Sequence, residues 1–229
     1  MTISFATSSI PADGTLVLPV SEGRALTPAG QAVDEATGGA LGRAMAAARF
    51  EGKAEQQAVV LAPHGVGLDR VVLLGIGKAG EFDALKALKL GGRAVRSAAG
   101  AAAIAVDISG LDGDQAALAA EVALGARLRA WRFDRYRSKK EGDDAPVDPA
   151  VTVMSGAGAE AAGAFEARNA AGDGVDFTRE LISEPANVLT PRNFMERLKD
   201  LARLGIDVEV GERRDAGADD HGHRRADGL

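Results

Sequence analysis

The sequence contains no cysteine, and it has only one tryptophan and one tyrosine. Without cysteine there can be no disulfide and no thiolate metal site, which is compatible with a reducing compartment. No stretch reaches the roughly 18 uninterrupted apolar residues that a membrane-spanning helix needs. The first residues also lack the basic segment and apolar run of a secretory signal. These absences lead us to expect a cytoplasmic protein with no membrane partner.

Basic residues are fewer than acidic ones, 27 against 33, so the formal net charge is −6. A negative balance disfavours a nucleic-acid partner, although a local basic patch could override it. Hydrophobic residues make up 46% of the chain and charged residues 26%, proportions typical of a globular protein. A length of 229 residues suits one domain or one and a half.

Short apolar runs alternate with alanine-rich helical stretches along most of the chain. The runs are mostly continuous, as expected for strands that are covered on both faces. Helix-length segments separate the runs, so we predict an α/β fold with a parallel or mixed sheet flanked by helices. The predicted strands are 3–6, 16–20, 58–62, 71–76, 102–108 and 151–154, and the predicted helices are 29–50, 82–99, 114–133 and 159–182.

The pattern divides the chain into a domain over residues 1–158, a connecting helix over 159–184 and the start of a second α/β domain over 185–210. In this third segment Thr190 is a helix cap before Pro191, and Gly205 ends the predicted helix. Residues 206–210 alternate as a half-buried strand does. The rest of the chain is rich in Asp, Arg and Gly, so we expect disorder there.

Gly75, Gly77 and Gly80 form a G-x-G-x-x-G pattern between a predicted strand and a predicted helix. Such glycines allow a tight turn and the close approach of a pyrophosphate to a helix N-terminus. Asp107 closes the next strand, but it lies farther away than the usual spacing of about 20 residues. The three glycines are therefore weak candidates for a nucleotide site.

Cations and aromatic rings are interleaved where the helix predicted over 114–133 ends. This combination can hold phosphates and stack bases. The same pattern also fits a helix end whose aromatic residues are core and whose cations are solvated, and acidic residues follow at once. We favour this second interpretation and place Trp131 in the core. The residues concerned are Trp131, Arg132, Phe133, Arg135, Tyr136, Arg137, Lys139 and Lys140.

The residues themselves indicate no catalytic site and no metal site. Asp219, Asp220, His221 and His223 have side chains that bind metals, but they lie on a segment with nothing to fix their geometry. His64 lies in a predicted turn. A G-x-S-x-G motif does not occur, and no pair of carboxylates has a spacing that suits acid–base catalysis.

Three segments resemble the leucyl aminopeptidase family. Residues 126–140, ARLRAWRFDRYRSKK, are similar to the family's "G-x-x-L-x-x-Y-x-F-D-x-Y-K", with Trp131 in place of Tyr and Arg137 in place of Lys. Residues 179–194, RELISEPANVLTPRNF, resemble the interdomain junction "R-x-L-x-N-x-P-x-N-x-L-T-P-x-x-F". Residues 71–78, VVLLGIGK, resemble a strand and loop of the same family, which offers another explanation for the glycine pattern.

The resemblance implies a macro-like N-terminal domain followed by a larger catalytic domain. It also implies a hexamer and a pair of divalent metals, zinc or manganese, that activate water to hydrolyse the first peptide bond of a peptide. The family's metal motifs, "K-G-x-x-F-D-x-G-G" and "N-T-D-A-E-G-R", do not occur here. No catalytic or metal-binding residue can therefore be assigned, and we expect this chain to hold no cofactor and to be inactive alone.

We expect a truncated or frameshifted gene, because the resemblance stops near residue 210. One alternative is a stand-alone macro-like module that binds a nucleotide or an ADP-ribose-like ligand at the glycine loop. The other is a regulatory domain that contacts DNA through the basic segment.

Overall fold

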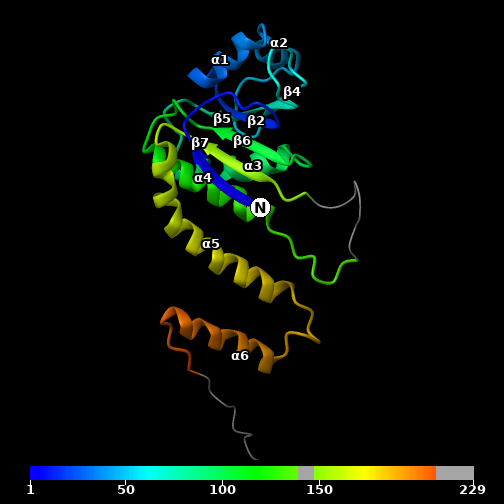
Figure 1. The fold of residues 1–229 in the computed structure, drawn as a ribbon, viewed down its shortest axis with the longest axis vertical. Coiled ribbons are helices and arrows are strands. Elements are labelled where there is room, and N and C mark those ends of the chain that lie inside the picture. The colour runs from blue at the N-terminus through cyan, green and yellow to red at the C-terminus, as the bar shows by residue number, and fades with distance from the viewer. Residues whose placement is uncertain (139–146, 210–229) are drawn as a thin grey trace, which may run out of the picture. The chain divides into compact units, whose positions relative to one another are not determined.

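The computed structural model describes residues 1–138 and 147–209 and divides into two compact units, Met1–Arg179 and Glu180–Leu229. The first unit is built on a seven-stranded sheet with the order β1-β7-β6-β2-β5-β4, and β3 pairs with β2 (Figure 1). Neighbouring strands are parallel except β4 with β5 and β3 with β2. The strands are β1 Thr2–Ala6, β2 Thr15–Ser21, β3 Ala25–Leu26, β4 Gln57–Leu61, β5 Arg70–Gly77, β6 Ala103–Asp107 and β7 Ala150–Met154.

Helices cover the sheet on two faces, and β2 contributes side chains to both. Val17 packs with residues of α3 (Ala84–Ser97) and α4 (Gln115–Ala130) in one apolar cluster. Leu16 and Leu18 point the other way and pack with residues of α1 (Pro28–Ala36) and α2 (Ala40–Ala47). This arrangement confirms the predicted α/β fold with a mostly parallel sheet flanked by helices.

Two glycines bring α3 and α4 into close contact. A Cβ on Gly91 would lie 1.9 Å from the carbonyl oxygen of Val122, and one on Gly125 would lie 1.8 Å from that of Leu88. Real Cβ atoms do not approach so closely, so only glycine permits this spacing of the two helices.

The six predicted strands are all present, but two other predictions were wrong. The predicted helix 29–50 is two helices, because Gly38 and Gly39 adopt left-handed φ values of 62° and 79° and interrupt it. Residues 206–209 form no strand, and residue 210 lies outside the described residues. The helix predicted over 159–182 is a 3₁₀ turn, Gly158–Glu160, followed by α5, Ala161–Ser183.

In the second unit the predicted capping is confirmed. The Thr190 hydroxyl accepts a hydrogen bond from the Asn193 amide, and Pro191 opens α6, Pro191–Lys199. A 3₁₀ helix, Asp200–Leu204, follows and ends at Gly205, whose φ is 79°. The segment 211–229, which we expect to be disordered, lies outside the described residues.

Candidate functional site

The glycine loop does not have the geometry of a dinucleotide-binding turn. Gly75 and Gly77 lie inside β5, and α3 begins only at Ala84, after the Asp83 cap. A Cβ on Gly75 would lie 2.0 Å from the Lys53 carbonyl oxygen, so this glycine allows close approach of the chain itself. The pattern therefore serves packing at Gly75, while Gly77 and Gly80 have positive φ and open space around them.

Arg93 links the C-terminal end of β5 to the residue that precedes β4. Its guanidinium donates to the carbonyl oxygens of Gly75 at 2.7 Å and Gln56 at 2.8 Å. Burial lowers the pKa of Arg93, and the Glu55 carboxylate opposes that shift. Arg93 is therefore committed to backbone oxygens.

Asp107, the acidic residue that a dinucleotide pattern would need, is buried at the end of β6. Its carboxylate accepts hydrogen bonds from the Ser8 and Ser109 hydroxyls and from the Ser109 amide. These donors engage both of its oxygens within the domain. The geometry therefore does not favour a ribose contact by Asp107.

The aromatic and basic residues at the end of α4 contact one another. Trp131 and Phe133 stack with ring centroids 6.4 Å apart, and the Arg179 guanidinium lies 5.6 Å from the Trp131 ring. Trp131 is half-buried, so our placement of this ring in the core was wrong. Trp131 is the C-terminal cap of α4, and the Arg179 guanidinium lies over one face of its ring.

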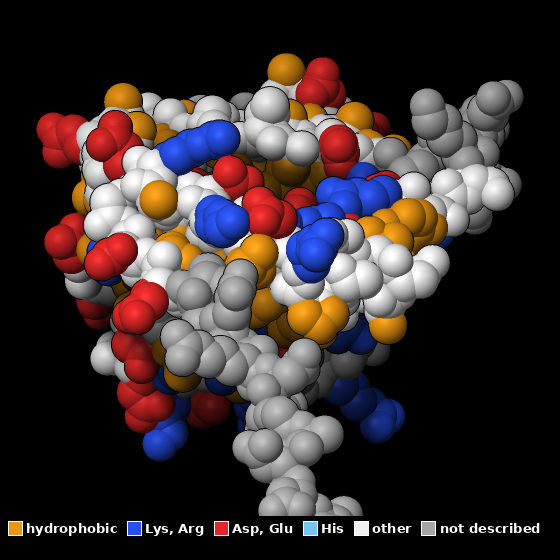
Figure 2. Space-filling model, turned by 90° about the horizontal axis from the view of Figure 1, so that it is seen from below, with side chains coloured by type: hydrophobic (Ala, Val, Ile, Leu, Met, Phe, Trp, Pro, Cys, Tyr) orange, Lys and Arg blue, Asp and Glu red, His pale blue; other side chains and the backbone are white. Residues whose placement is uncertain are grey.

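Charge around this segment is mixed. Arg132 forms an ion pair with Asp148 at 2.6 Å, and Arg135 lies over the Phe133 ring. Lys139 and Lys140 lie outside the described residues. Basic and acidic side chains are interspersed on the face shown in Figure 2. These observations favour the solvated helix end over a nucleic-acid interface.

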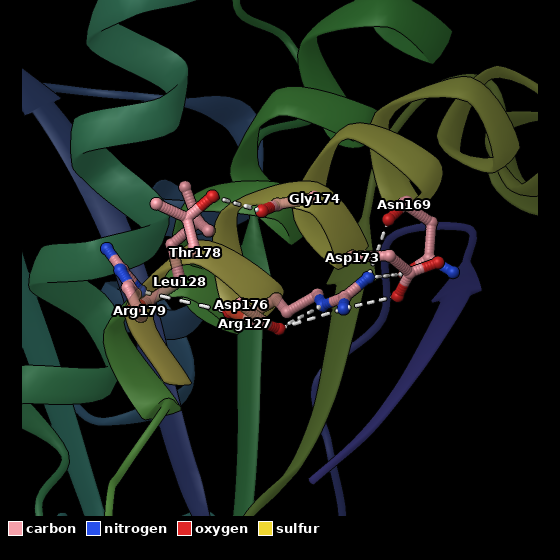
Figure 3. Close-up of polar contacts among 8 residues, drawn as sticks. All are labelled: Arg127, Leu128, Asn169, Asp173, Gly174, Asp176, Thr178 and Arg179. Atoms are coloured by element: carbon pink, nitrogen blue, oxygen red, sulfur yellow. Dashed lines mark hydrogen bonds and ion pairs between the residues drawn. The ribbon is translucent and has the colours of Figure 1, made fainter. Parts of the chain in front are cut away.

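Arg127 forms a polar clamp between α4 and α5 (Figure 3). Its Nη2 lies 2.6 Å from Asp173 Oδ1 and 2.8 Å from Asp176 Oδ2, and its Nη1 donates to the Asn169 carbonyl oxygen at 2.7 Å. A Cβ on Gly172 would lie 2.9 Å from the same Nη1, so a glycine makes room for the guanidinium. We refer to this group as the Arg127 clamp.

The electrostatics of the Arg127 clamp favour the charged guanidinium. Burial lowers the pKa of Arg127, whereas the hydrogen bonds and charges of Asp173 and Asp176 raise it, and the net result is a raised pKa. A cavity of about 480 Å³ lies beside the clamp and includes Trp131 and Phe165 in its wall. The carboxylates in the cavity wall are already paired: Asp173 and Asp176 with Arg127, and Asp148 with Arg132. We therefore interpret this region as a site of helix packing.

The junction motif forms a local clamp in the second unit. The Glu184 side chain has no exposed surface, and its Oε1 lies 2.9 Å from Arg197 Nη2 of α6. The Asn193 side chain donates to the Val188 carbonyl oxygen at 2.7 Å. The segment that resembles the family's interdomain junction therefore contacts α6 near both ends, through the Asn193 amide in the first turn and through Arg197 in the last.

The described residues include no group of three or more His, Asp or Glu side chains that could hold a metal ion. Asp219, Asp220, His221 and His223 lie outside these residues. Over 1–138 and 147–209, no helix combines the length and apolarity needed to cross a bilayer.

The sheet order and the two helical layers define a class: a mixed α/β domain with a mostly parallel sheet. A family model described as "Cytosol aminopeptidase family, N-terminal domain" matches residues 17–140, more than half of the chain. The chain therefore belongs to the cytosol aminopeptidase family.

Curated relatives agree with this assignment. A probable cytosol aminopeptidase of Caulobacter vibrioides is 39% identical over 218 residues, which cover 92% of this chain and 43% of that protein. Another, from Rhizobium meliloti, is 41% identical and covers 90% of this chain and 42% of that protein. The chain thus spans less than half the length of the curated relatives it matches and corresponds to the N-terminal part of a leucyl aminopeptidase.

Solved structures support the fold. A tomato leucine aminopeptidase mutant matches with a TM-score of 0.73 at 24% identity, over 89% of this chain and 42% of that one. The bottromycin maturation enzyme BotP in complex with Mn matches with a TM-score of 0.60 at 25% identity, over 85% of this chain and 37% of that one. The comparisons do not favour a stand-alone nucleotide-binding or DNA-contacting module.

Proposed function

We propose that this chain is the non-catalytic, assembly or regulatory part of a leucyl aminopeptidase that releases N-terminal amino acids from peptides. The observation that carries the proposal is the match of 92% of the chain to 43% of a probable cytosol aminopeptidase. The absence of a metal-binding group from residues 1–138 and 147–209 is compatible with chemistry carried by a different part of such an enzyme.

The proposal extends to cofactors, partners and location. The complete enzyme would use a pair of divalent metals, zinc or manganese, to polarise the scissile carbonyl and to activate water. Support for manganese comes from BotP, whose solved structure is in complex with Mn. We further propose a homo-oligomer that works on peptides in the cytoplasm, in keeping with the name of the relatives.

The experiment is hydrolysis of leucine amide by the purified chain, with added Mn²⁺, Zn²⁺ or Mg²⁺. We expect no leucine release, because two-metal hydrolysis needs several carboxylates fixed around two ions about 3.5–4 Å apart. The probable aminopeptidase from Caulobacter vibrioides is the positive control under the same conditions. Metal-dependent release by the chain alone, retained after removal of contaminating peptidases, would contradict a non-catalytic role.

A further inference from the structure

A small cavity lies at the carboxyl ends of three parallel strands in the first unit. Its volume is about 190 Å³, and its wall is formed by the segments that follow β2, β5 and β6. It is separate from the Arg127 clamp, with which it shares no lining residue. The lining residues are Ser21, Ala25, Leu26, Thr27, Pro28, Ile76, Ala79, Gly80, Phe82, Gly110, Leu111 and Asp112.

The topology of the sheet makes this position a natural ligand site. After β2 the chain passes over one face through α1 and α2, and after β5 it crosses the opposite face through α3 to reach β6. Since β2 lies between β5 and β6, the connections diverge at its carboxyl end. Open α/β sheets bind ligands in the crevice that such a divergence creates.

The inner wall of the cavity offers uncommitted hydrogen-bonding groups. Ser21 is 7% exposed, and its hydroxyl has no partner among the residues that the structure places. The Thr27 hydroxyl accepts from the Gly30 amide, which leaves its own proton to donate. The Ala79 and Gly80 amides also donate to no oxygen within the described chain. Together with the start of α1, these groups suit an anionic group such as a carboxylate.

The outer wall combines one carboxylate with apolar surface. Asp112 is exposed and forms no ion pair within the described residues. It does not cap α4 either, because Asp114 does so. Ile76, Phe82 and Leu111 supply apolar side chains beside it. The cavity thus presents an anion site, an acidic group and an apolar surface within one small volume.

We propose that this cavity binds a free amino acid with an apolar side chain. Ser21, Thr27 and the Gly80 loop would hold the α-carboxylate, Asp112 would hold the ammonium group, and Ile76 and Leu111 would contact the side chain. The volume is below the roughly 300 Å³ at which pockets for larger ligands begin, so a dinucleotide would not be enclosed. An amino acid released by the complete enzyme would be such a ligand, and only this link rests on the proposed function.

The test is isothermal titration of the full 229-residue chain with L-leucine. We expect saturable binding that Asp112→Asn and Ser21→Ala each weaken at least tenfold. Asp13→Asn is the matched control, because Asp13 is exposed and precedes the opposite end of β2. 4-Methylpentanoate, which lacks the ammonium group, should bind equally to the Asp112→Asn variant and to the unchanged chain.

Three results would overturn the proposal. One is the absence of L-leucine binding to a chain whose circular dichroism shows that it is folded. Another is L-leucine binding that Asp112→Asn and Ser21→Ala leave unchanged. The third is displacement of bound L-leucine by adenosine. Because the titration measures binding and not hydrolysis, its failure leaves the assignment to an aminopeptidase unaffected.

Discussion

Removing the Arg127 guanidinium should lower the free energy of unfolding of the first unit by more than the loss of an ordinary surface ion pair does. The side chain is 18% exposed, and the Asp176 partner is 21% exposed, so the pair is poorly screened by solvent. The Asp173 partner is 69% exposed and contributes little. Arg127→Ala also removes the hydrogen bonds that the Asn169 carbonyl and side-chain oxygens accept from Nη1.

The expected loss for Arg127→Ala is about 2–3 kcal/mol, from one charge-assisted contact to a half-buried carboxylate and one to a backbone oxygen. For a unit of this size, that loss lowers the melting temperature by about 4–12 °C. Arg127→Lys should cost less, because a lysine keeps the charge but cannot bond Asp173, Asp176 and Asn169 with one planar group.

Urea unfolding followed by circular dichroism measures this free energy. The matched control is Arg168→Ala, because Arg168 also joins α5 to α4, through Glu121 at 2.9 Å, but is 45% exposed. Glu121 is only 14% exposed, so the control should lose about 1 kcal/mol, still less than Arg127→Ala because Arg168 itself is screened by solvent. Equal losses for Arg127→Ala and Arg168→Ala would refute the reasoning that burial makes the Arg127 clamp strong.

Two further substitutions test packing. Gly125→Ala should cost about 3 kcal/mol or more in thermal unfolding, because its Cβ would lie 1.8 Å from the Leu88 carbonyl oxygen. Gly92→Ala, whose Cβ would have its nearest contact at 3.5 Å, should be neutral or stabilising, and equal effects would contradict the account. Trp131→Ala should cost about 1–2 kcal/mol in urea unfolding, because the ring is half-buried and covered by Arg179; a loss near 4 kcal/mol would show a buried ring instead.

The sequence was sufficient to predict the layered fold, because continuous apolar runs separated by helical segments have few other solutions. Capping residues were equally readable: Thr190 and Pro191 begin α6 where predicted, and Gly205 ends the helical segment. These signals act on neighbouring residues, so they do not depend on contacts with distant parts of the chain.

Features that depend on distant contacts were not readable. The alternation at 206–210 predicted a strand. Residues 206–209, however, pair with no other strand within the described part of the chain, and a strand needs such a partner. Nothing near Arg127 in the sequence indicates that Asp173 and Asp176 meet it, because the contact depends on how α5 packs on α4. The unpaired hydroxyl of Ser21 could not be predicted either, since it depends on three loops that converge.

The most direct test of the assignment is a chimera in which residues 1–204 of this chain replace the matching segment of the probable aminopeptidase from Caulobacter vibrioides. If the chain is the N-terminal part of such an enzyme, the purified chimera should release leucine from leucine amide when Mn²⁺ is supplied. A soluble, folded chimera that shows no metal-dependent release, beside an active parent enzyme, would contradict the account.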